Sequence, residues 1–74
     1  MEIKVKFFAT LRKGRGKFDM YKTNEEVTVK EILDYYNIEE EQASILYVNG
    51  RDVEFDRILE DGDVISIFPP VGGG

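Results

Sequence analysis

The chain ends in three consecutive glycines, Gly72–Gly74, directly after the segment Phe68-Pro69-Pro70-Val71. Because glycine has no side chain, a terminus of this kind fits a narrow channel in another protein. The free α-carboxylate of Gly74 is then the group that reaches a reaction centre there. A terminal carboxylate with a pKa of about 3.5 is ionised at neutral pH and is a poor electrophile. It therefore reacts only after activation, most simply as a mixed anhydride with AMP.

Two prolines precede the glycines and determine where the folded part of the chain ends. Pro69 and Pro70 have no backbone N–H, so they stop a strand and hold the next residues extended. Glycine retains more backbone freedom than any other residue. We therefore expect a folded domain over residues 1–68 and a flexible tail over residues 69–74, reaching about 20 Å when extended. A frayed terminus that nothing uses is the alternative.

The side chains that most enzymes use are absent from the 74 residues, which include no Cys and no His. Cys and His supply the commonest nucleophile, general base and metal ligands. Their absence excludes a disulfide framework, a zinc knuckle and an iron–sulfur cluster, and it argues against a self-sufficient enzyme. We expect no metal site, because the carboxylate run Glu39–Glu41 has no ligand spacing.

The net charge of −5 is unevenly distributed along the chain. Residues 1–22 carry seven cations and two anions, a net +5, whereas the remainder carries three cations and thirteen anions, a net −10. Phosphate backbones repel an acidic chain, so we expect protein partners rather than nucleic acid. The first apolar run, residues 7–9, is too short for a membrane span or a signal peptide. We therefore expect a cytoplasmic protein without a membrane partner.

The first 22 residues have the pattern of a β-hairpin. Alternation over residues 2–9 predicts a strand whose inner face is Ile3, Val5 and Phe7, with Phe8 on the outer face. Residues 13–16 contain two glycines and predict a turn. The alternation resumes over residues 17–22, where Phe18 and Met20 share one face.

A helix and a second group of strands follow. Thr28 and Glu31 fit a capping box, and an apolar stripe at helical spacing predicts a helix over residues 29–36 that stops at Asn37. Residues 44–48 predict a strand, Asn49-Gly50 a hairpin turn, and residues 51–54 a short return strand. Asp61-Gly62-Asp63 is a further turn, and residues 64–68 predict the last strand, with Ile65 and Ile67 inward and Phe68 outward.

This order of elements predicts an α+β domain with a mixed four- to five-stranded sheet and one main helix packed on one face. Pairing the first strand with the last in parallel closes the sheet, which is the β-grasp or ubiquitin-like fold. In that arrangement Phe8 and Phe68 both lie near the C-terminal ends of their strands, on the face away from the helix and beside the start of the tail. We expect these two exposed aromatics to be a docking anchor, with Arg12 at its rim.

Several segments of the chain resemble the small subunits of molybdopterin synthase, which are ubiquitin-like sulfur carriers related to the thiamine-pathway sulfur carrier. These segments are residues 3–9 with Leu11-Arg12, Val48-Asn49-Gly50, Leu59 with Asp61-Gly62-Asp63, and Phe68–Val71 with the terminal Gly73-Gly74. The resemblance covers essentially the whole chain, and the Phe-Pro-Pro-Val and diglycine ending is its most specific part. The segment after Leu11-Arg12 is shortened here to residues 13–16.

The resemblance implies a carrier that is not catalytic alone. A ubiquitin-activating-type enzyme adenylates the Gly74 carboxylate with ATP, and a persulfide sulfur donor replaces AMP to leave a thiocarboxylate. The carrier then docks on the large subunit of molybdopterin synthase, where the sulfur passes to a pterin precursor. No cofactor is bound permanently. Gly73 and Gly74 are the reactive end, and the partner-binding residues are Phe8, Arg12, Phe68, Pro69, Pro70, Val71 and Gly72.

Three other functions remain open on the same fold. The activated Gly74 would be joined to target lysines in a ubiquitin-like protein modifier. The sulfur would go to thiamine or another product in a carrier of a different pathway. In a passive binding module the tail would not be used at all.

Overall fold

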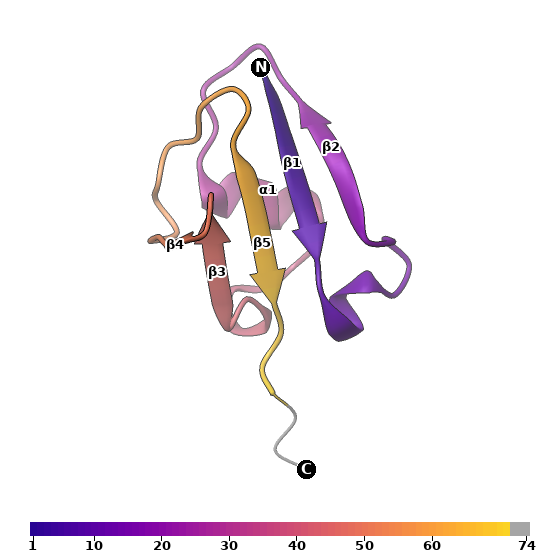
Figure 1. Ribbon diagram of the computed structural model, residues 1–74. Helices are drawn as coiled ribbons and strands as arrows, with labels where there is room; N and C mark the ends of the chain where they lie inside the picture. The colour runs from indigo at the N-terminus through magenta and orange to yellow at the C-terminus, as the bar shows by residue number, and fades with distance from the viewer. Residues whose placement is uncertain (72–74) are drawn as a thin grey trace.

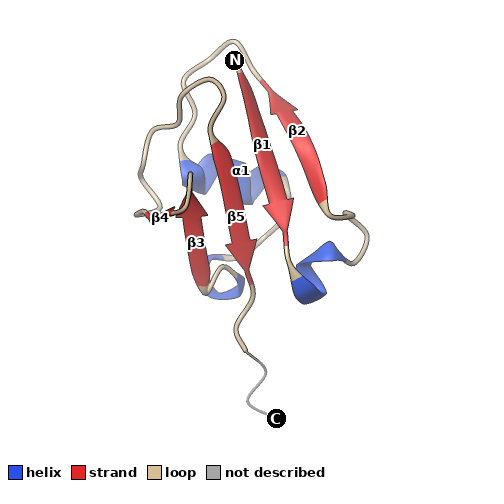
Figure 2. Ribbon diagram, viewed as in Figure 1, coloured by secondary structure: helices blue, strands red, loops and turns tan. Residues whose placement is uncertain are grey.

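The computed structural model describes residues 1–71, which form a five-stranded mixed sheet in the order β2-β1-β5-β3-β4. The main helix, α1, packs on one face of this sheet, and Figure 1 views the sheet from the opposite face. This arrangement confirms the predicted α+β β-grasp. Figure 2 distinguishes the elements, which are β1 (Glu2–Phe7), the 3₁₀ helix η1 (Ala9–Arg12), β2 (Phe18–Lys22), α1 (Val29–Tyr35), the 3₁₀ helix η2 (Glu40–Gln42), β3 (Ile45–Val48), β4 (Arg51–Asp52) and β5 (Val64–Phe68).

The first and last strands lie side by side and run in the same direction, as predicted. Phe7 of β1 pairs with Ile67 of β5 in a parallel register. β2 returns antiparallel to β1, with Lys4 opposite Met20, and completes the predicted first hairpin. Because β1 and β5 are parallel, both end at the same edge of the sheet, and the chain leaves the domain there (Figure 1).

The core lies between α1 and the sheet. The inward residues of the two central strands alternate with outward ones, as the period of a strand requires. Those that are completely buried are Ile3, Val5, Phe7, Ile65 and Ile67 from the sheet, and Val29 and Ile32 from the helix. Burying each such side chain contributes about 1.5–3 kcal/mol to folding. The predicted inner faces of the first and last strands are therefore confirmed.

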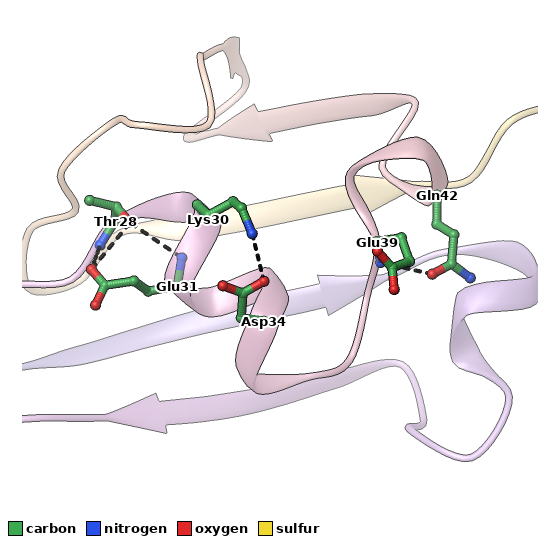
Figure 3. A network of polar contacts seen from close by, with 6 residues as sticks. All are labelled: Thr28, Lys30, Glu31, Asp34, Glu39 and Gln42. Atoms are coloured by element: carbon green, nitrogen blue, oxygen red, sulfur yellow. Dashed lines mark hydrogen bonds and ion pairs between the residues drawn. The ribbon is translucent and has the colours of Figure 1, made fainter.

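The helix begins at the predicted capping box. The backbone N–H of Glu31 donates to the Thr28 hydroxyl at 3.2 Å, and the backbone N–H of Thr28 donates to the Glu31 carboxylate at 3.0 Å. Figure 3 shows this pair together with the ion pair between Lys30 and Asp34, one turn apart at 2.8 Å. The helix ends at Tyr35, one residue before the predicted end.

The residues after the helix also behave largely as the sequence indicates. Asn37 has a φ of 58°, the left-handed conformation that ends a helix. The acidic connector contains one 3₁₀ turn, η2, in which the Glu39 backbone N–H donates to the Gln42 side chain at 2.8 Å (Figure 3). At the second hairpin, Asn49 and Gly50 both have positive φ, at 54° and 81°, as a two-residue turn of this kind requires.

Two local features differ from the sequence-based prediction. The return strand β4 ends at Asp52 instead of residue 54, because Val53 and Phe55 leave the sheet and pack against the core. The segment after β1 forms the 3₁₀ helix η1, which begins at Ala9 with a φ of 50°. No feature of the sequence predicted η1, yet its Leu11 is buried.

Candidate functional site at the root of the C-terminal tail

Two aromatic rings meet where the central strands end. Phe8 follows β1 and Phe68 ends β5, and their ring centroids are 4.1 Å apart with planes inclined by 15°. The Phe8 backbone N–H donates to the Ile67 carbonyl at 3.2 Å, so the parallel ladder continues one residue past β1. This ladder fixes both rings on the face opposite α1, beside the point where the chain leaves the sheet.

The two rings are half-buried, whereas the sequence led us to expect exposed rings. The difference arises because the rings stack and each covers part of the other. Tyr47 of β3 adds a third ring, whose centroid lies 5.9 Å from that of Phe68 in an edge-on arrangement. Sequence reasoning missed Tyr47, although its alternation with the buried Leu46 and Val48 assigns it to the outer face.

Arg12 lies at the rim of this aromatic group. Its Nε donates to the Phe7 carbonyl at 2.9 Å, which holds η1 against the end of β1. The guanidinium carbon is 5.4 Å from the Phe8 ring centroid, within the range of a cation–π contact. We call Phe8, Arg12, Tyr47 and Phe68 the tail-root patch. It combines apolar area with one positive charge at the start of the tail.

The described part of the tail projects away from the domain. Pro69 is half-buried, Pro70 is exposed, and the Val71 side chain is 92% exposed. Gly72, Gly73 and Gly74 lie outside the described residues, so the assignment of the reactive end and of a flexible tail over residues 69–74 stays a prediction. A large apolar side chain as exposed as Val71 is available for contact with another protein.

The described residues contain little that could perform chemistry unaided. Among residues 1–71, no group of three or more carboxylates has the geometry to hold a metal ion. Burial raises the pKa of Tyr36 well above its ordinary value, and a hydrogen bond to Asp19 adds to this effect. That hydroxyl lies on the α1 side of the sheet, not in the tail-root patch. Nor is any helix within these residues long and apolar enough to cross a membrane.

Comparison with known proteins identifies the family. Residues 5–74, nearly the whole chain, match the model of the ThiS family. The chain belongs to the ThiS family. This match confirms the resemblance to ubiquitin-like sulfur carriers, and we describe the chain as a ubiquitin-fold protein of the sulfur-carrier type.

Individual relatives of this ThiS-family chain carry different names. Small archaeal modifier protein 3 of Haloferax volcanii is 32% identical over an alignment of 92 positions that covers all of both chains. A putative molybdopterin converting factor subunit 1 from Pyrococcus furiosus is 29% identical and superimposes with a TM-score of 0.78, covering 96% of this chain and 99% of the other. The Pyrococcus furiosus protein shares the fold over nearly the full length of both chains.

A third relative was solved together with a second protein. The structure is a complex of subunits 1 and 2 of molybdopterin-converting factor from Helicobacter pylori. The matching chain is 29% identical to this one, with a TM-score of 0.66 and complete coverage of both chains. The names of the relatives therefore include both a protein modifier and a molybdopterin-converting factor.

Proposed function

We propose that this chain carries sulfur as a thiocarboxylate on Gly74 and donates it to a pterin precursor in the synthesis of molybdopterin, the organic part of the molybdenum or tungsten cofactor. The observation that supports this most is the parallel pairing of β1 with β5. It brings Phe8 and Arg12 to the point where the chain leaves β5 at Phe68. A partner that binds the tail-root patch is therefore also positioned to bind the tail.

The first chemical steps occur in a partner enzyme. A carboxylate oxygen of Gly74 attacks the α-phosphorus of ATP, and pyrophosphate leaves. The terminal sulfur of a persulfide donor then attacks the acyl carbon, and AMP leaves. A thiol cleaves the resulting acyl disulfide, supplying the two electrons that release the thiocarboxylate. This chain contributes only the terminus and the surface that delivers it, which agrees with the absence of Cys and His.

Two kinds of partner follow from this cycle. A ubiquitin-activating-type adenylating enzyme would hold the tail-root patch during activation, and the large subunit of molybdopterin synthase would hold it during sulfur transfer. The second partner is supported by the Helicobacter pylori complex, in which a similar chain is joined to subunit 2. ATP is a substrate of the activating enzyme, and we propose no permanently bound cofactor for this chain.

The molybdopterin pathway is favoured over other sulfur pathways by two observations. The Phe68-Pro69-Pro70-Val71 ending is the segment that most resembles molybdopterin synthase small subunits. Two of the solved relatives are also named after molybdopterin-converting factor. One is a putative subunit 1, and the other is a complex of subunits 1 and 2. Delivery to thiamine or another product is the alternative within the ThiS family.

A protein-modifier function is the second candidate. The observation that favours it is the 32% identity to a protein named small archaeal modifier protein 3. The two functions share the Gly74 adenylate and diverge afterwards. In a modifier, the amine of a target lysine attacks the acyl group, directly or after a thioester, and an isopeptide bond forms.

The deciding experiment follows the mass of the intact chain. The chain is incubated with its adenylating enzyme, ATP and a persulfide donor. A sulfur carrier gains the mass difference between sulfur and oxygen at its C-terminus, and it then transfers that sulfur to the pterin precursor when the large subunit is added. Conjugates of higher mass joined through Gly74, without a sulfur-bearing terminus, would instead support the modifier.

Two variants separate use of the tail from a passive module. Deleting Gly73 and Gly74 should abolish ATP–pyrophosphate exchange and sulfur loading. The control is Ile58→Ser, which changes an exposed side chain outside the tail and the tail-root patch and should remain active. If the deleted chain supports its cellular function as well as the full chain does, the tail is unused and the proposal is wrong.

A further inference from the structure

A second apolar group lies on the outer face of the sheet, away from the tail. Phe18 and Met20 of the edge strand β2 are 52% and 37% exposed. The β1–β2 register puts Phe18 opposite Lys6 and Met20 opposite Lys4, so all four side chains share the face opposite α1. We call Lys4, Lys6, Phe18 and Met20 the β2 patch. Neighbouring exposed apolar side chains on an edge strand are a feature of surfaces that contact another chain.

The two lysines of the β2 patch contact aromatic rings. The Nζ of Lys4 is 4.5 Å from the Phe18 ring centroid, and the Nζ of Lys6 is 5.7 Å from that of Phe8. Within residues 1–71, neither ammonium group forms an ion pair with a carboxylate. The patch therefore offers apolar area together with two positive charges that no carboxylate in this part of the chain neutralises.

The β2 patch is continuous with the tail-root patch. Lys6 links them, because it contacts the Phe8 ring and pairs with Phe18 across the two strands. The opposite end of the sheet carries the reverse charge on the same face, since Asp52 of β4 pairs with Tyr47. On this face Glu2 of β1 is paired with Lys22 of β2 at 3.6 Å, so Lys4 and Lys6 give this side of the sheet its net positive charge, and Asp52 is an anion over β4.

This uneven distribution of charge would help to orient the domain when its tail binds to an enzyme. A partner that held only the tail and the stacked rings would restrain rotation about the direction of the tail only through contacts close to that axis. Charges placed on one side of that axis fix the rotation, because only one orientation pairs them with opposite charges. Burial of Phe18 and Met20 in the same contact would supply affinity.

We propose that the β2 patch is an orientation-setting docking surface for the enzyme that adenylates Gly74. It fits a surface of that enzyme on which carboxylates alternate with apolar side chains. The proposal rests on the proposed function and extends the docking surface beyond the tail-root patch. The occupant is a protein because the exposed aromatic and thioether groups need an apolar counterpart, which a phosphate backbone does not provide.

The test measures ATP–pyrophosphate exchange by the adenylating enzyme at increasing concentrations of this chain. The Phe18→Ser/Met20→Ser variant should raise the half-saturating concentration about tenfold, with the maximal rate within about twofold of wild type. The Lys4→Glu/Lys6→Glu variant should raise it about tenfold at low salt and less at high salt, because salt screens exposed charges. The maximal rate is preserved since Gly74 is unchanged.

Two matched controls lie outside the β2 patch. Ile58→Ser removes a similarly exposed apolar side chain. Arg51→Glu reverses a charge on β4. The Arg51 side chain lies on the α1 face of the sheet, because Arg51 pairs with Val48. Both controls should match wild type. Far-UV circular dichroism and the thermal midpoint establish that each variant is folded. The NMR signals of Lys6 and Phe18, but not of Ile58, should shift when the enzyme is added to the full chain.

The outcomes distinguish this proposal from the proposed function. If the wild-type chain supports no exchange at any concentration, the proposed function fails and the docking surface fails with it. If wild type is active but the β2-patch variants match their controls, only the docking surface is wrong. Self-association of the wild-type chain that Phe18→Ser abolishes, with unchanged exchange kinetics, would likewise overturn it by identifying a second copy as the occupant.

Discussion

At the scale of single residues, Tyr36 has a side chain whose pKa the fold shifts, and the contacts that cause the shift are evident. Its hydroxyl donates to the Asp19 carboxylate at 2.8 Å, and its ring meets that of Phe7 edge-on at 5.1 Å between centroids. Burial raises the pKa of Tyr36, and the hydrogen bond to Asp19 raises it further. The folded chain therefore keeps this proton at a pH at which the unfolded chain loses it.

This difference predicts a pH dependence of stability. An unfolded tyrosine ionises near pH 10, so above that pH the folded state binds more protons and the free energy of unfolding falls as pH rises. Tyr36→Phe should lower stability by about 1 kcal/mol at pH 7, through loss of the hydrogen bond. It should also make the decline above pH 10 less steep. Urea unfolding at a series of pH values from 7 to about 11 measures both effects.

Asp19→Asn is the companion variant for this prediction. It keeps the Tyr36 hydroxyl and its burial but removes the charged acceptor, so the decline above pH 10 should be intermediate between wild type and Tyr36→Phe. Identical pH profiles for wild type and Tyr36→Phe would show that Tyr36 does not contribute to the alkaline loss of stability.

The positions of single residues were predictable from the sequence where they depend on strand period alone. Alternation assigned Phe8 and Phe68 to the outer face, and the structure has them there. Their half-burial was not predictable, because it depends on the register between strands that are distant in the sequence. Arg15 is a similar case: its guanidinium donates to the Tyr36 carbonyl at 3.1 Å, a contact that only the tertiary fold brings about.

At the scale of elements, α1 is short enough to depend on its ends. It contains seven residues, and helices of this length are unstable in isolation. Its stability comes from packing of Val29, Ile32 and Leu33 against the sheet, and from the Thr28 capping box. Loss of the cap leaves backbone N–H groups in the first turn without their side-chain acceptor.

Thr28→Ala should therefore lower the free energy of unfolding by about 1 kcal/mol. Thermal or urea denaturation at neutral pH measures the change. The control is Thr28→Ser, which keeps the hydroxyl that accepts from Glu31 and should lie within a few tenths of a kcal/mol of wild type. Equal stability of the Ala and Ser variants would mean that the side-chain cap contributes nothing measurable.

Elements with local signals were predicted well, and those without them were not. The capping box and the Asn49-Gly50 turn depend on neighbouring residues, and both form as expected. η1 requires a positive φ at Ala9, a conformation that alanine does not favour by itself. β4 ends early because Phe55 reaches the core, and that preference appears only once the core exists.

At the scale of the whole molecule, the contacts that stabilise the fold and the surfaces available to a partner lie at different ends of the sheet. Figure 1 shows the N-terminus and the end of the described chain at opposite ends of the sheet. At the N-terminal end, the Asn49 side chain donates to Asp63 at 2.9 Å and accepts from the Val64 backbone N–H at 3.0 Å, which ties the β3–β4 turn to β5. At the other end, the tail-root patch and the tail are available to a partner, so stability and delivery occupy different parts of the molecule.

This division predicts that the tail can be removed without unfolding the domain. A chain that ends at Phe68 should lose less than about 1 kcal/mol of stability, because Pro70 and Val71 are exposed and only Pro69 is half-buried. ATP–pyrophosphate exchange should disappear completely. A chain that ends at Val71 is the control for the contribution of Pro69, and it should match the full chain in urea unfolding while remaining inactive. A loss above about 2 kcal/mol on ending the chain at Phe68, recovered on ending it at Val71, would mean that the domain extends past residue 68 and that the tail begins later than we expect.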